Sequence, residues 1–284
     1  RKAAMPKGPH SQRITVADNE IAHCGRFTPE AVGVFVGDNA HCKIIHNHIY
    51  DLFYSGISVG SVQDFGPNQA AGNIIEYNHI HDIGQGMLSD LAGIYTCSSP
   101  GTRIRYNRVH DVSRRDYGGW GIYTDEGSHE LLIEKNLVFR CQDGALFAHH
   151  SRRITAENNI FALNRISQVD RGGVGGFELT CRRNVIYYEE GKAVGAYGSR
   201  RCGRDVCAFD QNLYWNAAGK PVLFGQRRLA EWQALGQDTN SLFADPMFVD
   251  LSNGDFQLQP ASPAAKTGFE PWDLTTVGRA HDRR

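Results

Sequence analysis

The tetrapeptide N-H-I-H at residues 78–81 returns, with changes, along most of the chain. Each copy starts with an asparagine, and its third residue is Ile or Val in every copy except the last. Successive copies lie 22 to 31 residues apart, and a period of this size indicates stacked structural repeats. The eight copies begin at Asn19, Asn47, Asn78, Asn107, Asn136, Asn158, Asn184 and Asn212.

The residues around each copy follow the period of a β-strand. T-R-I-R-Y (102–106) precedes one asparagine, and G-I-Y-T-D (121–125) follows it, so apolar and polar residues alternate on both sides. About three such runs belong to each repeat, and no helical pattern separates them. Coils of this kind bury their apolar column by stacking on one another. The sequence therefore predicts an all-β fold, a right-handed parallel β-helix of about eight coils.

The recurring asparagine is interpreted as a structural residue. Asn side chains tolerate tight turns and bond to nearby backbone, and amides stacked from coil to coil can also bond to one another. Adjacent coils should lie roughly 4.8 Å apart, the spacing of hydrogen-bonded strands. The same repeat unit carries His79, His81 and His110, which we expect to stack in columns.

The chain divides into a repeat region and a C-terminal segment. Residues 1–225 carry the β-helix repeats, and the first residues read as those of a fragment truncated at its N-terminus. Residues 226–284 contain one short amphipathic pattern, at about 227–235, and then a Pro- and Gly-punctuated tail with two short strand-like runs. We expect this segment to pack on the same solenoid as a cap, because a solenoid must cover its last exposed coil.

Composition limits the classes of partner. The formal net charge is −1, with acids and bases mixed, which argues against nucleic acid or an acidic membrane surface as the partner. No apolar run is long enough to cross a bilayer. The seven cysteines include no C-x-x-C pair, so a structural zinc site is not expected. Cys202 and Cys207 are the best candidates for a disulfide, whereas Cys24 and Cys141 should lie too many coils apart.

Polar residues break the repeat in its middle coils. Aligning the strands after each asparagine places Asp125 and Glu126 at the end of one strand and His149 and His150 at the same positions one coil on. A local break in a repeat is a better sign of function than polarity that recurs with it. The plain alternative is that residues 125–128 form an exposed turn.

The neighbouring loops supply further candidates for a groove that binds sugar. Asp90 precedes one G-I-Y-T strand, although an ordinary turn residue is the alternative interpretation there. Aromatic rings stack on sugars, and amides, carboxylates and Arg bond hydroxyl groups. The predicted substrate-binding residues are His149, His150, Trp120, Tyr117, Asp116, Gln168 and Arg171.

Carboxylates in such a groove suit glycoside hydrolysis, in which one acid protonates the leaving oxygen and a second attacks or activates water. We expect Glu126 as the general acid/base and Asp90 or Asp125 as the second carboxylate, with no metal or cofactor. Asp125 and Glu126 should point to opposite faces of their strand, so one of them would brace a turn, a histidine or a backbone donor. His149 is placed to tune a carboxylate or to bind a hydroxyl.

Two other functions remain open from the residues alone. A polysaccharide lyase would need a base and a cation: Arg115, Arg171 or His149 could be the base, and Asp90, Asp116 and Asp125 could hold calcium. A non-catalytic solenoid that binds carbohydrate would use the same groove without chemistry.

Several runs of the sequence are shared with a known family. They are Y-S-G-I-S-V-G (54–60), N-I-I-E-Y-N-H-I-H-D-I-G-Q-G-M-L-S-D-L-A-G-I-Y-T (73–96), S-P-G-T (99–102), D-Y-G-G-W-G-I-Y-T-D-E-G-S (116–128), and the tail runs A-D-P-M-F-V-D and G-D-F-Q-L-Q-P-A-S-P-A. Residues 47–275 resemble the right-handed parallel β-helix proteins of the pectate-lyase-like superfamily. They are most similar to proteins near glycoside hydrolase family 141.

The resemblance implies a secreted or periplasmic enzyme that acts on plant-type or other complex polysaccharide, with fucoside and xylan hydrolysis among the associated activities. The chain departs from the family pattern at F-A-H-H-S-R (147–152), where F-H-Q-H-Y-G-R is expected. The residues that match recurring polar positions of the family are Asp90, Asp125, Glu126, His149, Gln168 and Arg171.

Overall fold

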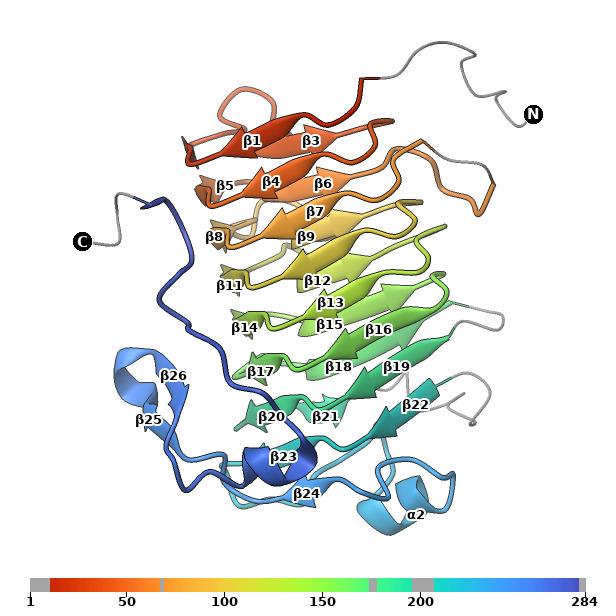
Figure 1. Ribbon diagram of the computed structural model, residues 1–284, viewed down its shortest axis with the longest axis vertical. Helices are drawn as coiled ribbons and strands as arrows, with labels where there is room; N and C mark the ends of the chain where they lie inside the picture. The colour runs from red at the N-terminus through yellow and green to blue at the C-terminus, as the bar shows by residue number, and fades with distance from the viewer. Residues whose placement is uncertain (1–10, 67–68, 174–177, 196–206, 281–284) are drawn as a thin grey trace.

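The chain winds into a parallel β-helix whose coils stack along the long axis of the molecule (Figure 1). The computed structural model describes residues 11–66, 69–173, 178–195 and 207–280. Three parallel sheets of eight, nine and seven strands run along the helix, and strands three apart in the sequence are neighbours. The predicted fold class, an all-β parallel solenoid of about eight coils, is confirmed.

Each sheet collects one strand from successive coils. The first sheet contains β1 (Thr15–Ala17), β4 (Lys43–Ile45), β7 (Ile74–Glu76), β10 (Arg103–Arg105), β13 (Leu132–Glu134), β16 (Ile154–Glu157), β19 (Leu179–Arg182) and β22 (Cys207–Asp210). The second contains β2 (Glu20–Ala22), β5 (His48–Leu52), β8 (His79–Ile83), β11 (Arg108–Val112), β14 (Leu137–Cys141), β17 (Ile160–Ala162), β20 (Val185–Tyr188), β23 (Leu213–Asn216) and β24 (Leu242–Phe243). The third contains β3 (Val34–Val36), β6 (Ile57–Val59), β9 (Leu91–Thr96), β12 (Gly119–Thr124), β15 (Gly144–His149), β18 (Ser167–Gly172) and β21 (Lys192–Val194).

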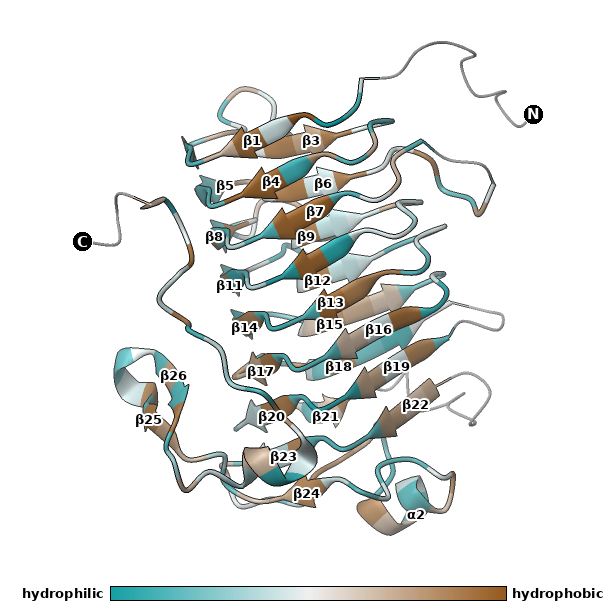
Figure 2. Ribbon diagram, viewed as in Figure 1, coloured by the Kyte–Doolittle hydropathy of each residue, from teal (hydrophilic) through white to brown (hydrophobic). Residues whose placement is uncertain are grey.

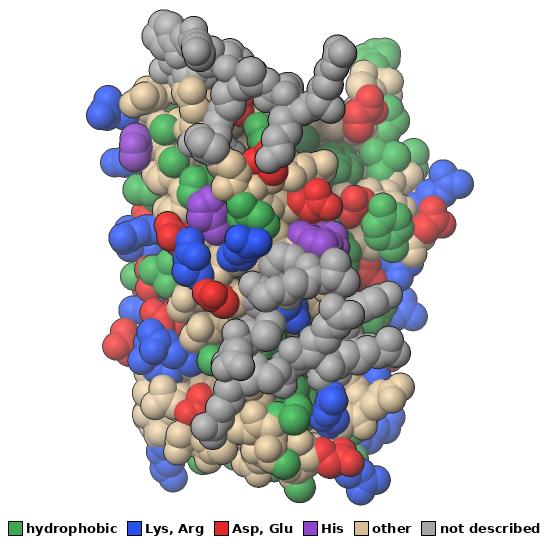
Figure 3. All heavy atoms as spheres, turned by 90° about the vertical axis from the view of Figure 1, so that its right-hand side faces the viewer, with side chains coloured by type: hydrophobic (Ala, Val, Ile, Leu, Met, Phe, Trp, Pro, Cys, Tyr) green, Lys and Arg blue, Asp and Glu red, His purple; other side chains and the backbone are tan. Residues whose placement is uncertain are grey.

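The core is a set of apolar columns, one or more for each sheet. In the first sheet Ile44 pairs with Ile75, Ile75 with Ile104 and Ile104 with Ile133, and all four side chains are fully buried. Burying one such side chain stabilises the fold by roughly 1.5–3 kcal/mol. Figure 2 shows the resulting contrast between apolar strand positions and hydrophilic turns, and acidic and basic side chains are interspersed on the face drawn in Figure 3.

The asparagines form a continuous hydrogen-bonded ladder, as expected from the repeat. Asn78 is typical: its backbone N–H and its side-chain amide both donate to Oδ1 of Asn107, at 3.0 Å each. The same amide donates to the carbonyl of Glu76 two residues back, which closes the turn. The ladder lies inside the solenoid, where Asn47, Asn78 and Asn107 are at most 1% exposed.

One rung of the ladder differs from the prediction. Asn136 donates to Asn159, not to Asn158, so the repeat in that coil is N-I-F-A from residue 159. Asn158 sits one residue earlier at φ 60°, and its amide donates instead to the carbonyl of Glu270 in the C-terminal segment. The Asn159 copy has Phe161 at its third position, where the other inner copies have Ile or Val, so the pattern favoured Asn158; the strand register, which pairs Val138 with Phe161, selects Asn159.

The expected histidine columns are confirmed on the outer face of the second sheet. His48 stacks on His79 with ring centroids 5.0 Å apart and planes 4° apart. In the next column His81 stacks on His110 with nearly the same geometry, at 5.0 Å and 3°.

The C-terminal segment both closes the last coil and returns along the solenoid. Helix α2 (Leu229–Gln233) is shorter than the predicted 227–235, and its Trp232 packs on Phe209 and Phe224 at the end of the core. The two predicted strands are β25 (Phe248–Asp250) and β26 (Asp255–Leu258), which form an antiparallel pair. Short 3₁₀ helices η1 (Leu251–Asn253) and η2 (Pro263–Thr267) adjoin this pair.

Residues 268–280, here called the strap, run back along the outer face of the second sheet toward the first coils (Figure 1). Gly278 donates its N–H to the carbonyl of Tyr77 at 2.8 Å, and Arg279 forms an ion pair with Glu20 of β2. This return could not be predicted from the sequence, because the strap has neither strand nor helix periodicity.

The structure describes both members of only one of the two cysteine pairs considered above. Cys202 lies outside the described residues, so its pairing with Cys207 stays a prediction. Cys24 and Cys141 are not joined to each other, as their separation along the solenoid requires.

We predict that Asn136→Ala lowers the free energy of unfolding by about 3 kcal/mol or more, because it leaves buried donors of Asn107 without their acceptor. Urea unfolding measures the change. Asn19→Ala at the exposed end of the same ladder is the control, and it should cost about 1 kcal/mol or less. Equal losses in the two variants would contradict a stabilising role for the buried ladder.

We also predict that the protein loses stability as the pH falls below about 6.5. Burial, followed by the neighbouring imidazoles of His110 and His81, lowers the pKa of His79 from 6.5 to about 2. Below pH 6.5 the unfolded chain gains a proton that folded His79 does not take up, which costs about 1 kcal/mol per pH unit. Urea unfolding at several pH values should show a shallower slope for His79→Gln; an unchanged slope would assign the effect to other groups.

Candidate functional site

A cavity of about 650 Å³ lies on the outer face of the third sheet, over β9, β12, β15 and β18. Its aromatic part is built from three side chains in contact. Trp120 stacks on Phe147 with ring centroids 4.3 Å apart, and Tyr123 meets Trp120 edge to face at 4.6 Å. Aromatic faces of this kind stack on sugar rings, and cavities of this volume enclose small ligands.

The glycine-rich run G-G-W-G-I-Y-T explains how Trp120 and Tyr123 reach the same face. Gly121 and Ile122 both turn toward the core, and a Cβ on Gly121 would lie 2.1 Å from Cγ1 of Val138. Only glycine fits so close to Val138, which reaches into the core from β14 of the second sheet. With two successive residues directed inward, the residues on either side of them both line the cavity.

Asp125 lies at the end of β12 and is only 4% exposed. Its Oδ1 accepts a hydrogen bond from Nδ1 of His149, one coil on, at 2.7 Å, and its Oδ2 accepts from the hydroxyl of Tyr95, one coil back. Burial acts to raise the pKa of Asp125, but the bonds from His149 and Tyr95 outweigh it, so that the pKa is lowered. Asp125 is therefore an ionised carboxylate that fixes the ring of His149, with the proton on Nδ1.

Asp90 lies just before β9 and faces the cavity. Its φ is 60°, a left-handed conformation that Asp tolerates, and its backbone is held at both ends: its N–H donates to Tyr117 at 2.9 Å and its carbonyl accepts from the Tyr54 hydroxyl at 2.9 Å. Burial raises the pKa of the Asp90 carboxyl, and the negative charge of Asp125 raises it further.

The hydroxyl of Tyr123 interacts with both carboxyl groups. It acts to lower the pKa of Asp90, against the burial that raises it, while burial and then the charges of Asp125 and Asp90 raise the pKa of Tyr123 itself. The charge of Asp125 also raises the pKa of Asp90 directly. Asp90, Tyr123 and Asp125 therefore form one electrostatically coupled unit.

The structure gathers most of the predicted site residues in one region. Asp90, Tyr117, Trp120 and His149 line the cavity, and Asp125 lies directly behind His149. Glu126 and His150 do not line it, but their ligand atoms and one of His149 lie within 4.8 Å of one another at its edge. Asp125, not Glu126, is the acid that braces a histidine.

Besides His150, three predicted substrate-binding residues lie outside this cavity. Asp116 is directed to solvent, with a 76% exposed side chain near Ser89 and Arg115. Gln168 is fully buried, and its amide exchanges hydrogen bonds with Asn164. Arg171 pairs in register with Ala148, on the inner face of β18, and is 3% exposed.

The predicted site residues omit several residues that line the cavity, among them Tyr123, Phe147, Asp143 and Asp170. Tyr123, Phe147 and Asp170 occupy one register column of the third sheet and all face the cavity. Strand alternation was the available signal: if Val169 is a core residue, then Asp170 faces outward while Gln168 and Arg171 do not. Asp170 also lies three strands from Asp90, about 14 Å along the solenoid, too far to act as its catalytic partner.

The proposed calcium ligands do not come together. Within the described ranges, two groups bring at least three possible ligand atoms within 4.8 Å: Glu126, His149 and His150, and separately His48, His79 and His81. Neither group includes Asp90, Asp116 or Asp125.

In the described part of the chain, no helix has the length and apolar character needed to span a membrane.

Comparisons with known proteins identify the family. A family model described as a right handed beta helix region matches residues 8–201, more than half of the chain, and the chain belongs to this family. Among proteins with curated descriptions, none matches the sequence. A solved structure described as the complex of XylC with xylose is 16% identical, with a TM-score of 0.48. The match covers 75% of this chain but 39% of that one, and similarity at this level concerns the fold alone.

We predict that Tyr123→Phe raises the pKa of Asp90, because the variant removes a hydroxyl that stabilises the ionised carboxylate. Carbon-13 NMR titration of labelled aspartate carboxyls measures the change. Tyr50→Phe, on the second sheet, is the control and should leave Asp90 unchanged. An unaltered Asp90 titration in Tyr123→Phe would show that the hydroxyl does not interact with the Asp90 carboxyl.

Proposed function

We propose that this protein is a glycoside hydrolase that acts on a complex polysaccharide, with Asp90 and Asp125 as its carboxyl pair. The observation that carries the proposal is the Asp90–Tyr123–Asp125 unit at the wall of an aromatic cavity. Two carboxyls whose surroundings move their pKa values in opposite directions are the usual basis for dividing acid and base roles.

Asp90 is the proton donor in this proposal, since its raised pKa keeps it protonated to higher pH than an ordinary aspartate. It faces the cavity, where it gives its proton to the leaving glycosidic oxygen. Asp125 stays ionised and stabilises the positive charge that develops on the sugar ring. A water molecule then adds to the anomeric carbon and gives a proton back to Asp90, which restores the acid. Glu126, first expected as the acid/base, is the next carboxylate at the cavity edge.

The cavity walls favour a neutral sugar. Asp90, Asp143 and Asp170 line it, and among its described lining residues there is no Lys or Arg. The described lining therefore offers no Lys or Arg to pair with the carboxylate of a uronate, and Asp143 is itself paired with Arg114. The rings of Trp120 and Phe147 suit the apolar face of a neutral pyranose. Xylan and fucosylated glycans, which the resemblance to glycoside hydrolase family 141 implies, are neutral at the bond to be cleaved.

A polysaccharide lyase is the second candidate. Its support is His149, whose ring is oriented by Asp125 and lines the cavity, as a general base requires. A lyase must also neutralise the uronate carboxylate, and the basic residues considered for this lie elsewhere: Arg115 has a 70% exposed side chain, and Arg171 faces the core side of β18. A binding module without catalysis would use the same aromatic surface.

We predict that wild-type protein releases reducing sugar from neutral polysaccharides and that Asp90→Asn loses at least about 100-fold in kcat, the usual contribution of a general acid. A panel of xylans, fucosylated glycans and pectins serves as substrate. Glu126→Gln is run in parallel to test the alternative acid. Glu130→Gln, an exposed carboxylate paired with Arg153, is the control and should keep full activity.

The products distinguish the three functions. Release that survives Asp90→Asn but not Glu126→Gln would move the acid role to Glu126. Products that absorb in the ultraviolet and disappear in His149→Gln would establish the lyase. Saturable oligosaccharide binding without any product, lost in Trp120→Ala, would establish the binding module.

A further inference from the structure

Four histidines gather on the outer face of the second sheet, away from the cavity described above. His48 and His81 approach through their Nε2 atoms at 2.8 Å, and His79 and His110 do the same at 2.8 Å. The residues come from β5, β8 and β11, so the stacking of coils brings them together. Possible ligand nitrogens of His48, His79 and His81 all lie within 4.8 Å of one another.

Carboxylates fix the rings from behind. Nδ1 of His81 is 2.7 Å from Oδ2 of Asp82, and Nδ1 of His110 is 2.6 Å from Oδ2 of Asp111. A carboxylate only accepts, so each Nδ1 carries a proton and each Nε2 presents a lone pair to the neighbouring histidine. A histidine held in this way by a carboxylate is the usual arrangement of a metal-binding imidazole.

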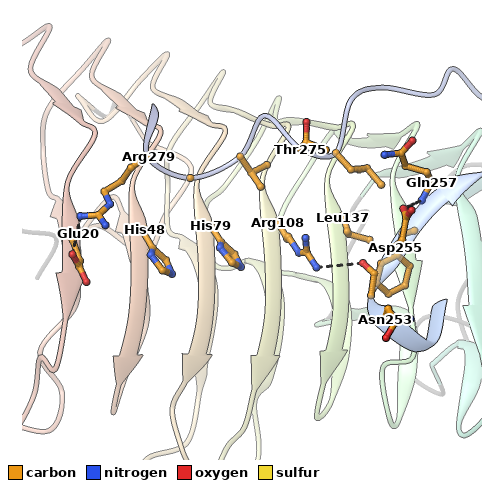
Figure 4. A pocket seen from close by; sticks show the side chains of 15 residues that line it. Glu20, His48, His79, Arg108, Leu137, Asn253, Asp255, Gln257, Thr275 and Arg279 are labelled. Carbon is orange, nitrogen blue, oxygen red and sulfur yellow. Dashed lines mark hydrogen bonds and ion pairs between the residues drawn. The ribbon is translucent and has the colours of Figure 1, made fainter. Parts of the chain in front are cut away.

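The cluster opens into a second cavity of about 650 Å³ between the sheet and the C-terminal segment. Figure 4 shows His48, His79 and Arg108 side by side on successive strands, with Thr275 and Arg279 of the strap opposite them. The strap passes close to His79, since a Cβ on Gly278 would lie 3.5 Å from that of His79. Small solutes can therefore reach His48 and His79 from the cavity.

We propose that His48, His79 and His81 bind one divalent first-row transition metal ion, with Zn²⁺ as the reference case. Imidazole nitrogen is a preferred ligand of Zn²⁺, Cu²⁺ and Ni²⁺, whereas Ca²⁺ and Mg²⁺ prefer oxygen. Three histidine ligands leave one position of a tetrahedral ion for water or a solute from the cavity. The stacked histidines thereby gain a role beyond filling the repeat.

Binding requires the rings to move. Zinc lies about 2.0–2.1 Å from each imidazole nitrogen, so two ligands of a tetrahedral ion are separated by roughly 3.4 Å. The Nε2 atoms of His48 and His81 are 2.8 Å apart, the length of a hydrogen bond that the ion must displace. His79 must also turn, because its ring lies parallel to that of His48, with the two planes 4° apart, and its Nε2 is hydrogen-bonded to His110.

We predict that chelator-treated protein binds one Zn²⁺ per chain by calorimetry, and that Co²⁺ gives the visible absorption of a tetrahedral site. His81→Gln should abolish this binding. Asp82→Asn, whose half-exposed side chain touches no predicted ligand except His81, should weaken it about tenfold or more and leave circular dichroism unchanged. Zn²⁺ should also raise the unfolding temperature of wild type and not that of His81→Gln.

Two controls keep the assignment specific. His41→Gln, an exposed histidine outside both ligand groups, should bind like wild type. His150→Gln removes a member of the other group, Glu126–His149–His150, and should also bind like wild type. Absence of saturable Zn²⁺ binding in wild type, unchanged affinity in both Asp82→Asn and His81→Gln, or loss of binding in His150→Gln alone would each overturn the proposal.

Discussion

The stacking of coils through hydrogen bonds is the constraint on which the rest of the molecule depends. Main-chain bonds within the three sheets set the spacing, and the asparagine ladder fixes the register from coil to coil. Each rung satisfies buried backbone and amide groups that would otherwise be costly inside the solenoid. Along the asparagine ladder, the neighbours of a residue in space are consequently its counterparts 23 to 31 positions away in the sequence.

The same register assembles both clusters of titratable groups. At the candidate active site, Asp125 reaches Tyr95 one coil back and His149 one coil on. On the second sheet, His81 reaches His48 by the same step. These contacts need no special loop, because a change of residue type within a column is enough to bring an acid beside a histidine. A solenoid can thus acquire chemistry by local substitution while its core columns stay apolar.

The features that follow from the repeat period could be predicted from the sequence. The strands, the ladder, the histidine columns and the alignment of Asp125 with His149 all follow from repeats of about 28 residues and from alternation within strands. The register was wrong by one residue at Asn158, because that copy has Ile at its third position whereas the true copy, from Asn159, has Phe161 there. Gln168 and Arg171 were assigned to the groove because polarity, not alternation, was used to choose them; the bonds of Gln168 to Asn164 show a structural role.

Features that depend on the direction of individual side chains or on isolated long-range contacts could not be predicted from the sequence. Tyr123 faces the same cavity as Trp120 only because Gly121 and Ile122 both turn inward, and no repeat pattern reveals such a pair. The strap lies against residues about 110 to 260 positions earlier, through isolated contacts such as Glu270 with Asn158 and Gly278 with Tyr77, so no periodicity predicts it.

The most direct test of the proposed catalytic arrangement is a crystal structure of Asp90→Asn with a neutral oligosaccharide bound. The account predicts a sugar ring stacked on Trp120 and Phe147, with the glycosidic oxygen within hydrogen-bonding distance of residue 90 and the ring on the Asp125 side of Tyr123. An oligosaccharide bound on another face, or in this cavity with its glycosidic bond far from residue 90, would contradict it.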